Sequence, residues 1–453
     1  MRTKPTLPRP QRATLHIDHE QSRAREERVR SQTVAIVGLG YVGLPLAVLA
    51  RKKGLRVRGF DIDTEKIAMI NTGEVPYLTP DEQESLTKLH LHASADTSVL
   101  AGADTYVICV PTPVHHDHEP DLGPLESACR MVAPHLTRGS LVIVESTVNP
   151  GVSESIALKI LEDGSGLTAG KDFSFAYCPE RINPGDEKWN VRTIPRVLGG
   201  LDERSLERAK AFYEEVIEGP IFAMGSIKEA EAVKMVENAF RDVNIAFVNE
   251  LAMSFSKAGI DLTNVLDGAA TKPFGFVAFT PGCGVGGHCI PVDPYYLIRY
   301  GRENGFEHRF LVAAREINNQ MPLHTVDLAE EALESKGIAI AGARVTLLGL
   351  AYKRDISDLR ESPALDIANE LERRGAIVTT YDPYVLERST VASTDDALSG
   401  ADAVVIATDH AHFCDLTAAQ FSSHDVRVVV DGRNCLDKAS IEAAGIAYRG
   451  IGR

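Results

Sequence analysis

The chain has little of what would build a disulfide-stapled or zinc-binding protein. Among 453 residues there are 7 cysteines and a single tryptophan, and no two cysteines stand at CxxC spacing. A sparse, odd set of cysteines argues against a disulfide framework and against a zinc cluster, and it favours a reducing, cytoplasmic environment. We expect no structural metal.

Long apolar runs are also scarce. Residues 33–50 carry no charged side chain and lie between an Arg-rich segment and Arg51-Lys52-Lys53, which has the outline of a signal anchor. Three glycines and Pro45 interrupt this run, and a β-branched segment, 33–37, precedes the glycines. We therefore interpret it as a buried strand, a tight turn and a helix, with no membrane partner.

Positive charge is in deficit. Lys and Arg total 48 against 63 Asp and Glu, which gives a net charge of −15. A chain this acidic is a poor general ligand for nucleic acids or anionic membranes, because both are polyanions. A local basic pocket for a phosphorylated small molecule is still compatible with this charge.

What the chain does contain is an alternation of short apolar strands with amphipathic helices, after a polar segment 1–30 that we expect to be a flexible tail. The pattern predicts an α/β fold with doubly wound parallel sheets in an N-terminal and a C-terminal domain. The expected strands are 33–38, 55–60, 104–110, 140–145, 173–177, 195–199, 345–350, 377–382, 403–407 and 426–431.

A segment without Gly or Pro, 226–258, separates the two strand-rich parts. Its apolar residues recur near helical period, which predicts one helix of about 45 Å at 1.5 Å per residue. Its surplus of apolar surface suggests a subunit interface. Residues 270–297 are rich in Gly and Pro, and we expect them to form a loop.

The sequence Gly38-Leu39-Gly40-Tyr41-Val42-Gly43 has the GxGxxG spacing. It ends the first expected strand and opens a helix, where such glycines let a dinucleotide pyrophosphate approach the helix N-terminus. Asp61 ends the next strand and is placed to bond an adenosine ribose, which favours NAD over NADP. Arg58 and Lys66 nearby weaken that choice.

Three further groups of residues contain side chains that commonly bind ligands. Val110-Pro111-Thr112-Pro113 and Glu145-Ser146-Thr147 each follow a strand, at the edge where ligands bind in doubly wound sheets, although each alone is also typical of a turn. Lys234, Asn238 and Arg241 share one face of the long helix, which by itself also fits a solvated stripe.

Residues 282–294 form the most informative stretch, GCGVGGHCIPVDP. Its glycines permit close approach of a ligand, and Cys289 stands beside His288 and four positions before Asp293, as a nucleophile could. A metal site is the rival interpretation, but two cysteines and one histidine make poor zinc spacing. An inert buried cysteine is the third interpretation of Cys289.

Together these motifs resemble the UDP-glucose/GDP-mannose dehydrogenase family, and within it the branch that acts on UDP-N-acetyl-hexosamines. The resemblance covers roughly residues 33–435 and rests on seven blocks in the expected order: GLGYVGLPLA at 38, VPTP at 110, ESTVNPG at 145, YCPERINPGD at 177, EAVKMVENAFRDVNIAFVNEL at 231, PGCGVGGHCIPVDPYYL at 281 and AYKRDISDLRESP at 351. It implies an NAD-binding Rossmann domain (31–222), a central helical domain with the cysteine loop (223–325) and a UDP-binding Rossmann-like domain (326–453), with a homodimer formed through the long helix.

The family implies a four-electron oxidation of a sugar C6 alcohol to a carboxylate with two NAD. Carried over, Cys289 resembles the nucleophile, Lys234 and Asp293 the pair that handles the alcohol proton and the oxyanion, Thr147 a water-positioning residue, Glu180 an aid to thioester hydrolysis, and Asn238 a further catalytic residue. Positions that match cofactor binding are Gly38, Gly40, Tyr41, Val42, Gly43, Asp61, Lys66, Thr112, Thr147 and Arg360. Positions that match substrate binding are Arg181, Ile182, Lys234, Asn238, Arg241, Lys272, Gly286 and Lys353.

The resemblance leaves the sugar open. The blocks ATKPFGF and CIPVDPYYL look like UDP-N-acetylglucosamine 6-dehydrogenases, our first choice, whereas AYCPER and FRDVNIAF look as much like UDP-N-acetylmannosamine dehydrogenases; UDP-glucose is a further candidate. A single-step NAD-dependent sugar-acid dehydrogenase and a non-catalytic nucleotide-sugar sensor are more distant alternatives. The product is expected to be a surface polysaccharide precursor. Cys283, six residues before Cys289, suggests an inactivating disulfide within the loop.

Overall fold

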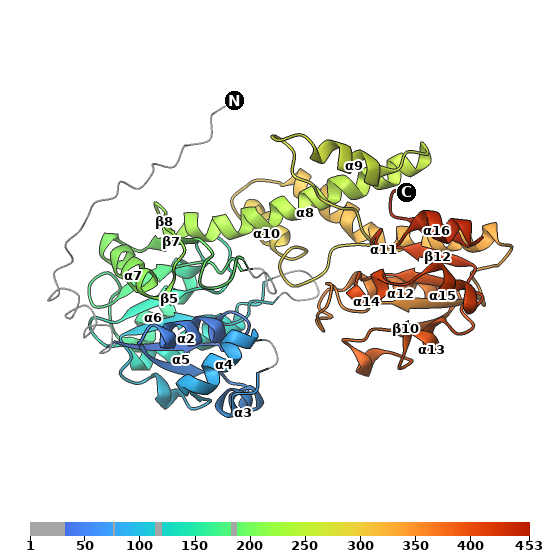
Figure 1. Cartoon of the computed structure of the whole chain (residues 1–453). Coiled ribbons are helices and arrows are strands. Elements are labelled where there is room, and N and C mark those ends of the chain that lie inside the picture. Colours follow the sequence, from blue (N-terminus) through green and yellow to red (C-terminus); the bar gives the residue numbers. More distant parts are fainter. Residues whose placement is uncertain (1–31, 76–77, 114–119, 183–187) are drawn as a thin grey trace. The chain divides into compact units, whose positions relative to one another are not determined.

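The computed structural model describes residues 32–75, 78–113, 120–182 and 188–453 (Figure 1). The chain forms two compact units: unit 1 comprises residues up to Thr112 and Leu122–Glu231, and unit 2 comprises Pro113–Asp121 and Ala232–Arg453. The tail predicted at 1–30 lies outside the described residues. No helix in the described part of the chain is long and apolar enough to cross a membrane.

Unit 1 is built on one eight-stranded sheet with the order β3-β2-β1-β4-β5-β6-β7-β8. Its elements are β1 (Thr33–Val37), α2 (Gly43–Lys52), β2 (Arg56–Phe60), α3 (Thr64–Thr72), α4 (Pro80–Leu89), β3 (His92–Ser94), η1 (Thr97–Leu100), β4 (Thr105–Ile108), α5 (Gly123–Val132), η2 (Ala133–His135), β5 (Leu141–Val144), η3 (Ser153–Ala157), α6 (Leu158–Ser165), β6 (Ser174–Tyr177), β7 (Arg196–Gly200), α7 (Glu203–Val216) and β8 (Ile221–Ala223).

Both faces of this sheet are covered, because its strands are apolar on both sides. In β1, Val34 and Ile36 belong to the core formed with α2, α3 and α7, whereas Ala35 and Val37 belong to the core formed with α5 and α6. Strand β1 is hydrogen-bonded to β2 on one side and to β4 on the other. The strand order therefore reverses beside β1, and the carboxyl ends of β1 and β4 border the crevice where doubly wound sheets bind ligands.

Two strands depart from the expected parallel arrangement. Strands β1 to β6 pair in parallel, but β7 runs antiparallel to β6, with Ala176 opposite Gly200 and Tyr177 opposite Gly199. Strand β8 is then parallel to β7. Strands β3 and β8 are three residues long and were not expected, since so short a run carries little periodic signal.

Unit 2 begins with long helices. Helix α8 (Ile227–Lys257) starts in unit 1 and continues into unit 2, and its bounds agree with the predicted helix to within one residue at each end. It is followed by α9 (Leu262–Ala270), α10 (Asp293–Glu303) and α11 (Arg309–Ser335). The loop predicted over 270–297 is wrong at its end, because Asp293 and Pro294 open α10, in the places where acidic residues and proline favour a first turn.

The remainder of unit 2 is a five-stranded parallel sheet in the order β10-β9-β11-β12-β13, with helices on both faces. Its elements are β9 (Arg344–Leu348), α12 (Pro363–Arg373), β10 (Ile377–Tyr381), η4 (Leu386–Arg388), α13 (Thr394–Leu398), β11 (Ala403–Ile406), α14 (Ala411–Cys414), α15 (Ala418–Ser423), β12 (Val428–Asp431), α16 (Lys438–Ala443) and β13 (Ala447–Gly450). The strand order reverses beside β9. The two-sheet α/β fold predicted from the sequence is confirmed. The predicted boundary at 325/326 falls within α11, which packs against this sheet.

Candidate active site

The glycine-rich turn joins β1 to α2 with no room for side chains at two of its three glycines. Gly38 has φ +92°, and a Cβ there would lie 2.7 Å from the carbonyl oxygen of Cys109. A Cβ on Gly43 would lie 1.9 Å from the carbonyl oxygen of Gly38. A Cβ on Gly40 would meet nothing within 4 Å, so the turn is closed toward the protein and open at Gly40. This is the shape that a dinucleotide pyrophosphate needs, and Tyr41 and Val42 lead from it into α2.

Asp61 is buried directly after β2 and ties this turn to α3. Its Oδ2 accepts hydrogen bonds from the backbone N–H of Leu39 at 2.8 Å and from Lys66 Nζ at 2.9 Å. Its Oδ1 accepts from the backbone N–H of Asp63 at 3.0 Å. The structure thus brings together Asp61, Lys66 and the glycine turn. The guanidinium of Arg58 instead donates to the carbonyls of Val99 and Ala101.

The segments after β4 and β5 contact each other, as expected from adjacent parallel strands. Thr112 Oγ1 donates to the carbonyl oxygen of Thr147 at 2.7 Å, and Ser146 Oγ donates to the carbonyl oxygen of Val110 at 2.8 Å. These bonds fix Thr112 and Thr147 together at the carboxyl edge of the sheet, where both were predicted to face ligands.

The segment after β6 wraps around the side chain of Glu180. Its Oε1 accepts from the backbone N–H groups of Arg181 at 2.6 Å and Ile182 at 2.7 Å. Its Oε2 accepts from Arg196 Nη1 at 2.7 Å. The Arg181 guanidinium donates to the carbonyl oxygen of Pro195 at 3.0 Å. Glu180 is therefore buried, and hydrogen bonds to both of its carboxylate oxygens fix the orientation of its side chain.

Around Arg196 lies a buried polar group, which we call the Arg196 cluster; its members are Cys109, Glu145, Glu180, Arg196 and Tyr213. Arg196 is 0 % exposed, and its Nη1 lies 3.7 Å from Glu145 Oε2. The Tyr213 hydroxyl donates to Glu145 Oε1, and Cys109 Sγ donates to Glu145 Oε2 at 3.8 Å. Sequence reasoning missed Arg196 and Tyr213; the available signal was one arginine inside an apolar strand.

In unit 2, α8 and α10 present a second polar group. Asn238 Nδ2 donates to Asp293 Oδ2, and both residues are buried, with 7 % and 2 % of their surface exposed. Burial raises the pKa of Asp293 to about 6, although the Lys234 ammonium and the Asn238 hydrogen bond act in the opposite direction. The structure therefore brings Asn238 and Asp293 together, within the electrostatic influence of Lys234, and their catalytic roles stay predictions. Arg241 lies one turn further along α8 and is exposed.

Cys289 is half-buried at the start of the turn that leads into α10. Its carbonyl oxygen accepts from the backbone N–H groups of Asp293 at 2.8 Å and Val292 at 3.2 Å. Burial, followed by the charge of Asp293, raises the pKa of the Cys289 thiol to about 11, while Lys234, Arg360 and Arg241 lower it. The thiol is consequently protonated at neutral pH, and its proton must be removed for it to attack.

The cysteine loop packs against the segment that follows β9. A Cβ on Gly286 would lie 2.6 Å from Tyr352 Cβ, and one on Gly287 would lie 2.8 Å from the Tyr352 ring. The backbone N–H of Gly287 donates to the carbonyl oxygen of Arg360 at 2.9 Å. Segment 351–361, with Lys353 and Arg360, is thereby held against the loop that carries Cys289.

The side chain of Arg360 is paired with Asp358. Its Nη2 and Nε donate to the two carboxylate oxygens at 2.5 Å and 3.0 Å. Half of the Arg360 side chain is exposed. Asp358 thus orients the guanidinium, and a ligand phosphate would have to compete with this carboxylate.

Two predictions concern residues away from Cys289. Lys272 is exposed, and its ammonium lies 5.1 Å from the centroid of the Phe274 ring; its role stays a prediction. Cys283 is fully buried and its Sγ donates to the carbonyl oxygen of Ala407 at 3.3 Å. All seven cysteines are free thiols in this structure, so the suggested bridge between Cys283 and Cys289 is not formed.

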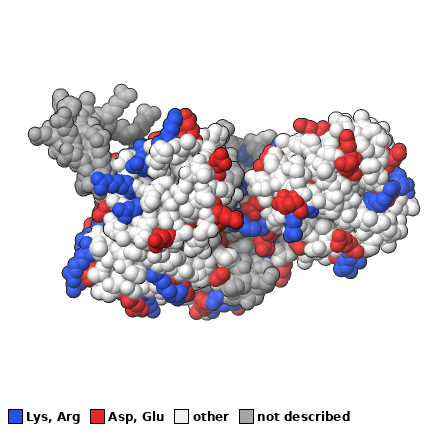
Figure 2. Space-filling view, turned by 90° about the horizontal axis from the view of Figure 1, so that it is seen from below, with Lys and Arg blue, Asp and Glu red and all other residues white. Residues whose placement is uncertain are grey.

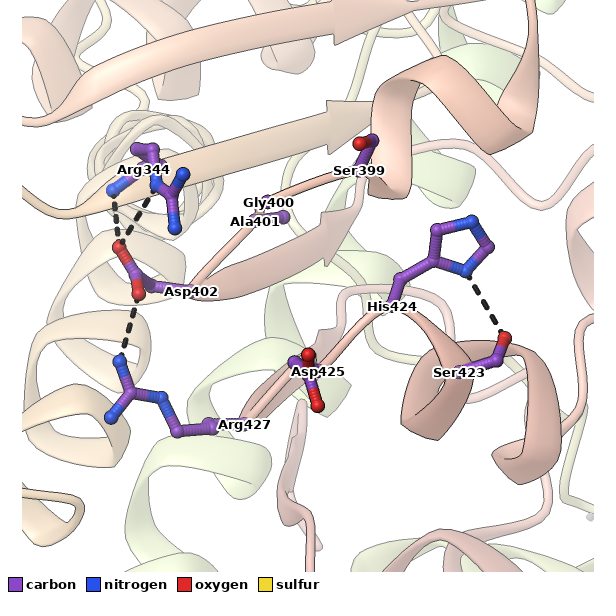
Figure 3. A pocket seen from close by; sticks show the side chains of 9 residues that line it. All are labelled: Arg344, Ser399, Gly400, Ala401, Asp402, Ser423, His424, Asp425 and Arg427. Atoms are coloured by element: carbon purple, nitrogen blue, oxygen red, sulfur yellow. Dashed lines mark hydrogen bonds and ion pairs between the residues drawn. The ribbon is translucent and has the colours of Figure 1, made fainter.

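A pocket of about 480 Å³ lies at the opposite, amino-terminal edge of the unit 2 sheet (Figure 3). Arg344 and Arg427 line it, but the Asp402 carboxylate accepts hydrogen bonds from the backbone of the first and from the guanidinium of the second, both at 2.9 Å. The Arg344 guanidinium also lies 3.7 Å from Asp402, so both arginine charges face this carboxylate, and none of the predicted site residues lines the pocket. No group of His, Cys, Asp and Glu suited to a metal ion is found in the described part of the chain.

On the face shown in Figure 2, Lys and Arg side chains lie among Asp and Glu on the surface of both units. The interspersed charges agree with the composition and give this face no continuous basic surface.

Three segments of the chain match the domains of one protein family. Residues 32–217 match the NAD-binding domain, 228–320 the central domain and 346–438 the UDP-binding domain of the UDP-glucose/GDP-mannose dehydrogenase family. The chain belongs to this family. It is a nucleotide-sugar dehydrogenase with NAD as its cofactor, as the sequence motifs predict.

Named relatives agree on the family and differ in the sugar. A UDP-N-acetyl-D-mannosamine dehydrogenase from Pyrococcus horikoshii is 39% identical over 425 residues, 93% of this chain and 99% of the relative. A UDP-N-acetyl-D-glucosamine 6-dehydrogenase from Pseudomonas aeruginosa is 39% identical over 391 residues, 85% of this chain and 92% of the relative. The solved structure of UDP-D-ManNAc dehydrogenase from Pyrococcus horikoshii has a TM-score of 0.87 and 38% identity, covering 93% and 99% of the two chains.

Proposed function

We propose that this dehydrogenase oxidises the C6 alcohol of a UDP-N-acetyl-hexosamine, with UDP-N-acetylglucosamine as the first choice, to the uronic acid in two steps at Cys289. The observation that carries the proposal is the local structure around that cysteine. Its loop leads into the helix of Asp293, whose carboxylate is bonded to Asn238, and packs on the segment that carries Lys353 and Arg360. A thiol, a proton-handling pair and cations for a diphosphate thus converge within unit 2.

The cofactor fits the glycine turn of unit 1. Gly38 and Gly43 keep the backbone close to its neighbours while the open position at Gly40 admits a pyrophosphate, and Asp61 and Lys66 stand beside the turn for the adenosine ribose. Tyr41, Val42, Thr112 and Thr147 border the same edge of the sheet. Bound NAD accepts one hydride in each of the two oxidations. We propose that Asp61 makes NAD preferred over NADP.

In the proposed first step, Lys234 and Asp293 take the C6 hydroxyl proton while the alcohol becomes an aldehyde. Asp293 is largely ionised at neutral pH, because its pKa lies near 6, and Asn238 orients the carboxylate. The Cys289 thiol then adds to the aldehyde, its proton passes by way of the same polar pair to the carbonyl oxygen, and the product is a thiohemiacetal. The bare aldehyde is a poor hydride donor, because losing a hydride would leave an acylium cation. The tetrahedral adduct can lose its hydride with formation of a carbonyl group, and its oxidation yields a thioester.

In the proposed last step, water cleaves the Cys289 thioester to the carboxylate and regenerates the thiol. Thr147 positions the water and Glu180 assists the cleavage. The balance is one alcohol, two NAD and one water, giving one carboxylate, two NADH and three protons. Arg181, Ile182, Arg241, Lys272, Gly286, Lys353 and Arg360 are proposed to hold the UDP-sugar and to orient it against the cofactor.

The test is a panel of UDP-GlcNAc, UDP-ManNAc, UDP-GalNAc, UDP-glucose and GDP-mannose with NAD. We expect two NADH for each UDP-N-acetyl-hexosamine consumed and the highest kcat/KM with UDP-GlcNAc. A preference for UDP-ManNAc would move the substrate to the sugar named in the Pyrococcus horikoshii relative. One NADH per sugar would indicate a single-step dehydrogenase, and no NADH with any sugar would overturn the proposed activity.

A further inference from the structure

The reversal of β7 determines which residue faces Glu180. In the antiparallel pair of β6 and β7, Tyr177 is opposite Gly199. Continued by three residues beyond β6, the same register places Glu180 opposite Arg196, and the ion pair at 2.7 Å joins these two side chains. A parallel β7 would instead set its last residues at this edge of the sheet. The unexpected strand direction therefore delivers one arginine to one carboxylate that the sequence motifs single out.

We propose that Arg196 is the positioning residue that holds the Glu180 carboxylate for thioester cleavage, and that Glu145 controls this hold by competing for the same guanidinium. The inference rests on the proposed function, because it assigns Arg196 and Glu145 to the last step of that reaction. Both act through Glu180.

The hydrogen bonds of Glu180 explain why Arg196 is needed. Oε1 is held by two backbone N–H groups, whereas Oε2 accepts from Arg196 Nη1. Without Arg196, Glu180 would lose the cation that compensates its buried charge, and its carboxylate would not be held in this orientation. This change would deprive the proposed cleavage step of an oriented carboxylate.

Arg196 itself is held almost entirely by carboxylates. Its Nε and Nη2 are buried and find no hydrogen-bond acceptor among the described residues. Its Nη1 is shared between Glu180 at 2.7 Å and Glu145 at 3.7 Å, and the guanidinium lies 5.7 Å from the centroid of the Tyr213 ring. Its position thus depends on how the charge is divided between the two carboxyl groups.

The Arg196 cluster has one cation for two carboxyl groups, so ionising both leaves a net negative charge in a buried region. The groups that face Glu145 are Arg196, Glu180, the Tyr213 hydroxyl and the thiols of Cys109 and Cys178. Burial raises the pKa of Glu145 to about 7, with Glu180 acting in the same direction and Arg196 in the opposite one. Below pH 7 Glu145 holds a proton and Arg196 serves Glu180; above pH 7 an ionised Glu145 competes for it.

The experiment compares Arg196→Met, Arg196→Lys and Glu145→Gln with the wild-type enzyme on the best UDP-sugar of the panel. In Arg196→Met we expect both NADH of the first turnover to form at near-normal rates and thioester cleavage to slow by roughly ten- to a hundredfold. Mass spectrometry of acid-quenched enzyme should then show an acyl group on Cys289. Arg196→Lys should restore part of the rate.

The pH profile separates positioning from a purely structural role. Wild-type thioester cleavage should decline as pH rises through about 7, and Glu145→Gln should lack this limb because its side chain cannot ionise. Arg315→Met is the matched control, since Arg315 is also buried and ion-paired, with Asp242 at 2.6 Å. It should lower stability without accumulating the acyl enzyme.

If Arg196→Met fails to fold, Arg196→Lys and Glu145→Gln still carry the test. The role of the cluster alone would be overturned if the variants slowed NADH formation and thioester cleavage equally, without a Cys289 adduct. It would also be overturned if Glu145→Gln kept the wild-type decline of thioester cleavage above about pH 7. A wild-type enzyme that never forms a Cys289 adduct would overturn the proposed function and this inference together.

Discussion

The buried Asp293 affects the half-buried Cys289, because the charge of its carboxylate disfavours the thiolate. The negative Asp293 carboxylate helps to raise the pKa of the Cys289 thiol to about 11. A thiol in this state resists premature oxidation and alkylation, since the thiolate is the reactive form. In the proposed reaction, the thiolate therefore forms only where a base and an aldehyde are present together.

Replacing Cys289 by Ser should separate the two oxidations. An alkoxide is a far poorer leaving group than a thiolate, so Cys289→Ser should reduce uronic acid formation by more than about a hundredfold. The affinity for NAD, measured by calorimetry, should stay within about twofold, because unit 1 carries the glycine turn. Cys414→Ser is the control, because this thiol donates to the Asp409 carbonyl and is none of the proposed site residues. Uronic acid made at the normal rate would refute covalent catalysis.

We predict that protonation of Asp293 makes the rate of the first oxidation depend on pH. The pKa of Asp293 is raised from the ordinary value of 3.8 to about 6, so the carboxylate takes up a proton as pH falls through 6. We expect kcat/KM for the UDP-sugar to fall along a limb near this pH. Folding stability has the opposite slope: the folded chain holds this proton more tightly, so the Asp293 contribution decreases as pH rises from about 4 to 6.

Asn238→Ala should move this limb to higher pH, since the Asn238 hydrogen bond lowers the pKa of Asp293. Asn244→Ala is the matched control on the same helix, because its amide bonds only to the Phe240 carbonyl. The measurement is kcat/KM against pH for the three enzymes. A limb that stays in place in Asn238→Ala would show that another group controls it.

At the scale of secondary-structure elements, the turn between β1 and α2 separates folding from cofactor binding. Gly43→Ala would force a Cβ to 1.9 Å from the Gly38 carbonyl oxygen, whereas Gly40→Ala meets nothing within 4 Å. Gly43→Ala should therefore lower the free energy of unfolding by at least about 1–3 kcal/mol. Gly40→Ala should keep the wild-type Tm and weaken NAD about tenfold, because its methyl group enters the space of the pyrophosphate.

Thermal unfolding and NAD calorimetry on both glycine variants provide the check. A Gly40→Ala protein with unchanged NAD affinity would show that the cofactor does not approach this turn. Equal losses of stability in the two variants would contradict the packing difference described above.

Elements with strong periodic signals could be predicted from the sequence, and those set by long-range pairing could not. Helix α8 was expected from its apolar period and the absence of Gly and Pro, and β1 with its glycine turn from local spacing. The reversed β7 has no local signal, because strand direction depends on the partner strand.

Arg196 was missed for the same reason, whereas Cys289, Asp293 and Asn238 were identified through motifs whose residues do meet. The start of α10 at Asp293-Pro294 could have been predicted from capping rules.

For the whole molecule, the open question that α8 raises is what covers its apolar face. Val236, Phe240 and Phe247 are 59%, 51% and 53% exposed. At 100° per residue they lie within about 40° of one another around the helix axis, so they form one stripe. Contiguous exposed apolar surface of this kind is typical of an interaction site. We propose that a second copy of the chain covers it, which makes the enzyme a homodimer through the central helix.

Phe247→Asp tests this assembly, because it places a charge in the stripe at a side chain that is already exposed in one chain. Burying that carboxylate in an interface would cost several kcal/mol, whereas a single chain tolerates it. Light scattering after size exclusion should give twice the mass of one chain for the wild type and the mass of one chain for Phe247→Asp, with the far-UV circular dichroism unchanged. Ile377→Asp is the control, since Ile377 is 59% exposed on the edge strand β10, outside the stripe. It should leave the dimer intact.

A Phe247→Asp protein that stays dimeric would show that α8 is not the interface, and a wild-type monomer would show that the stripe serves some other contact.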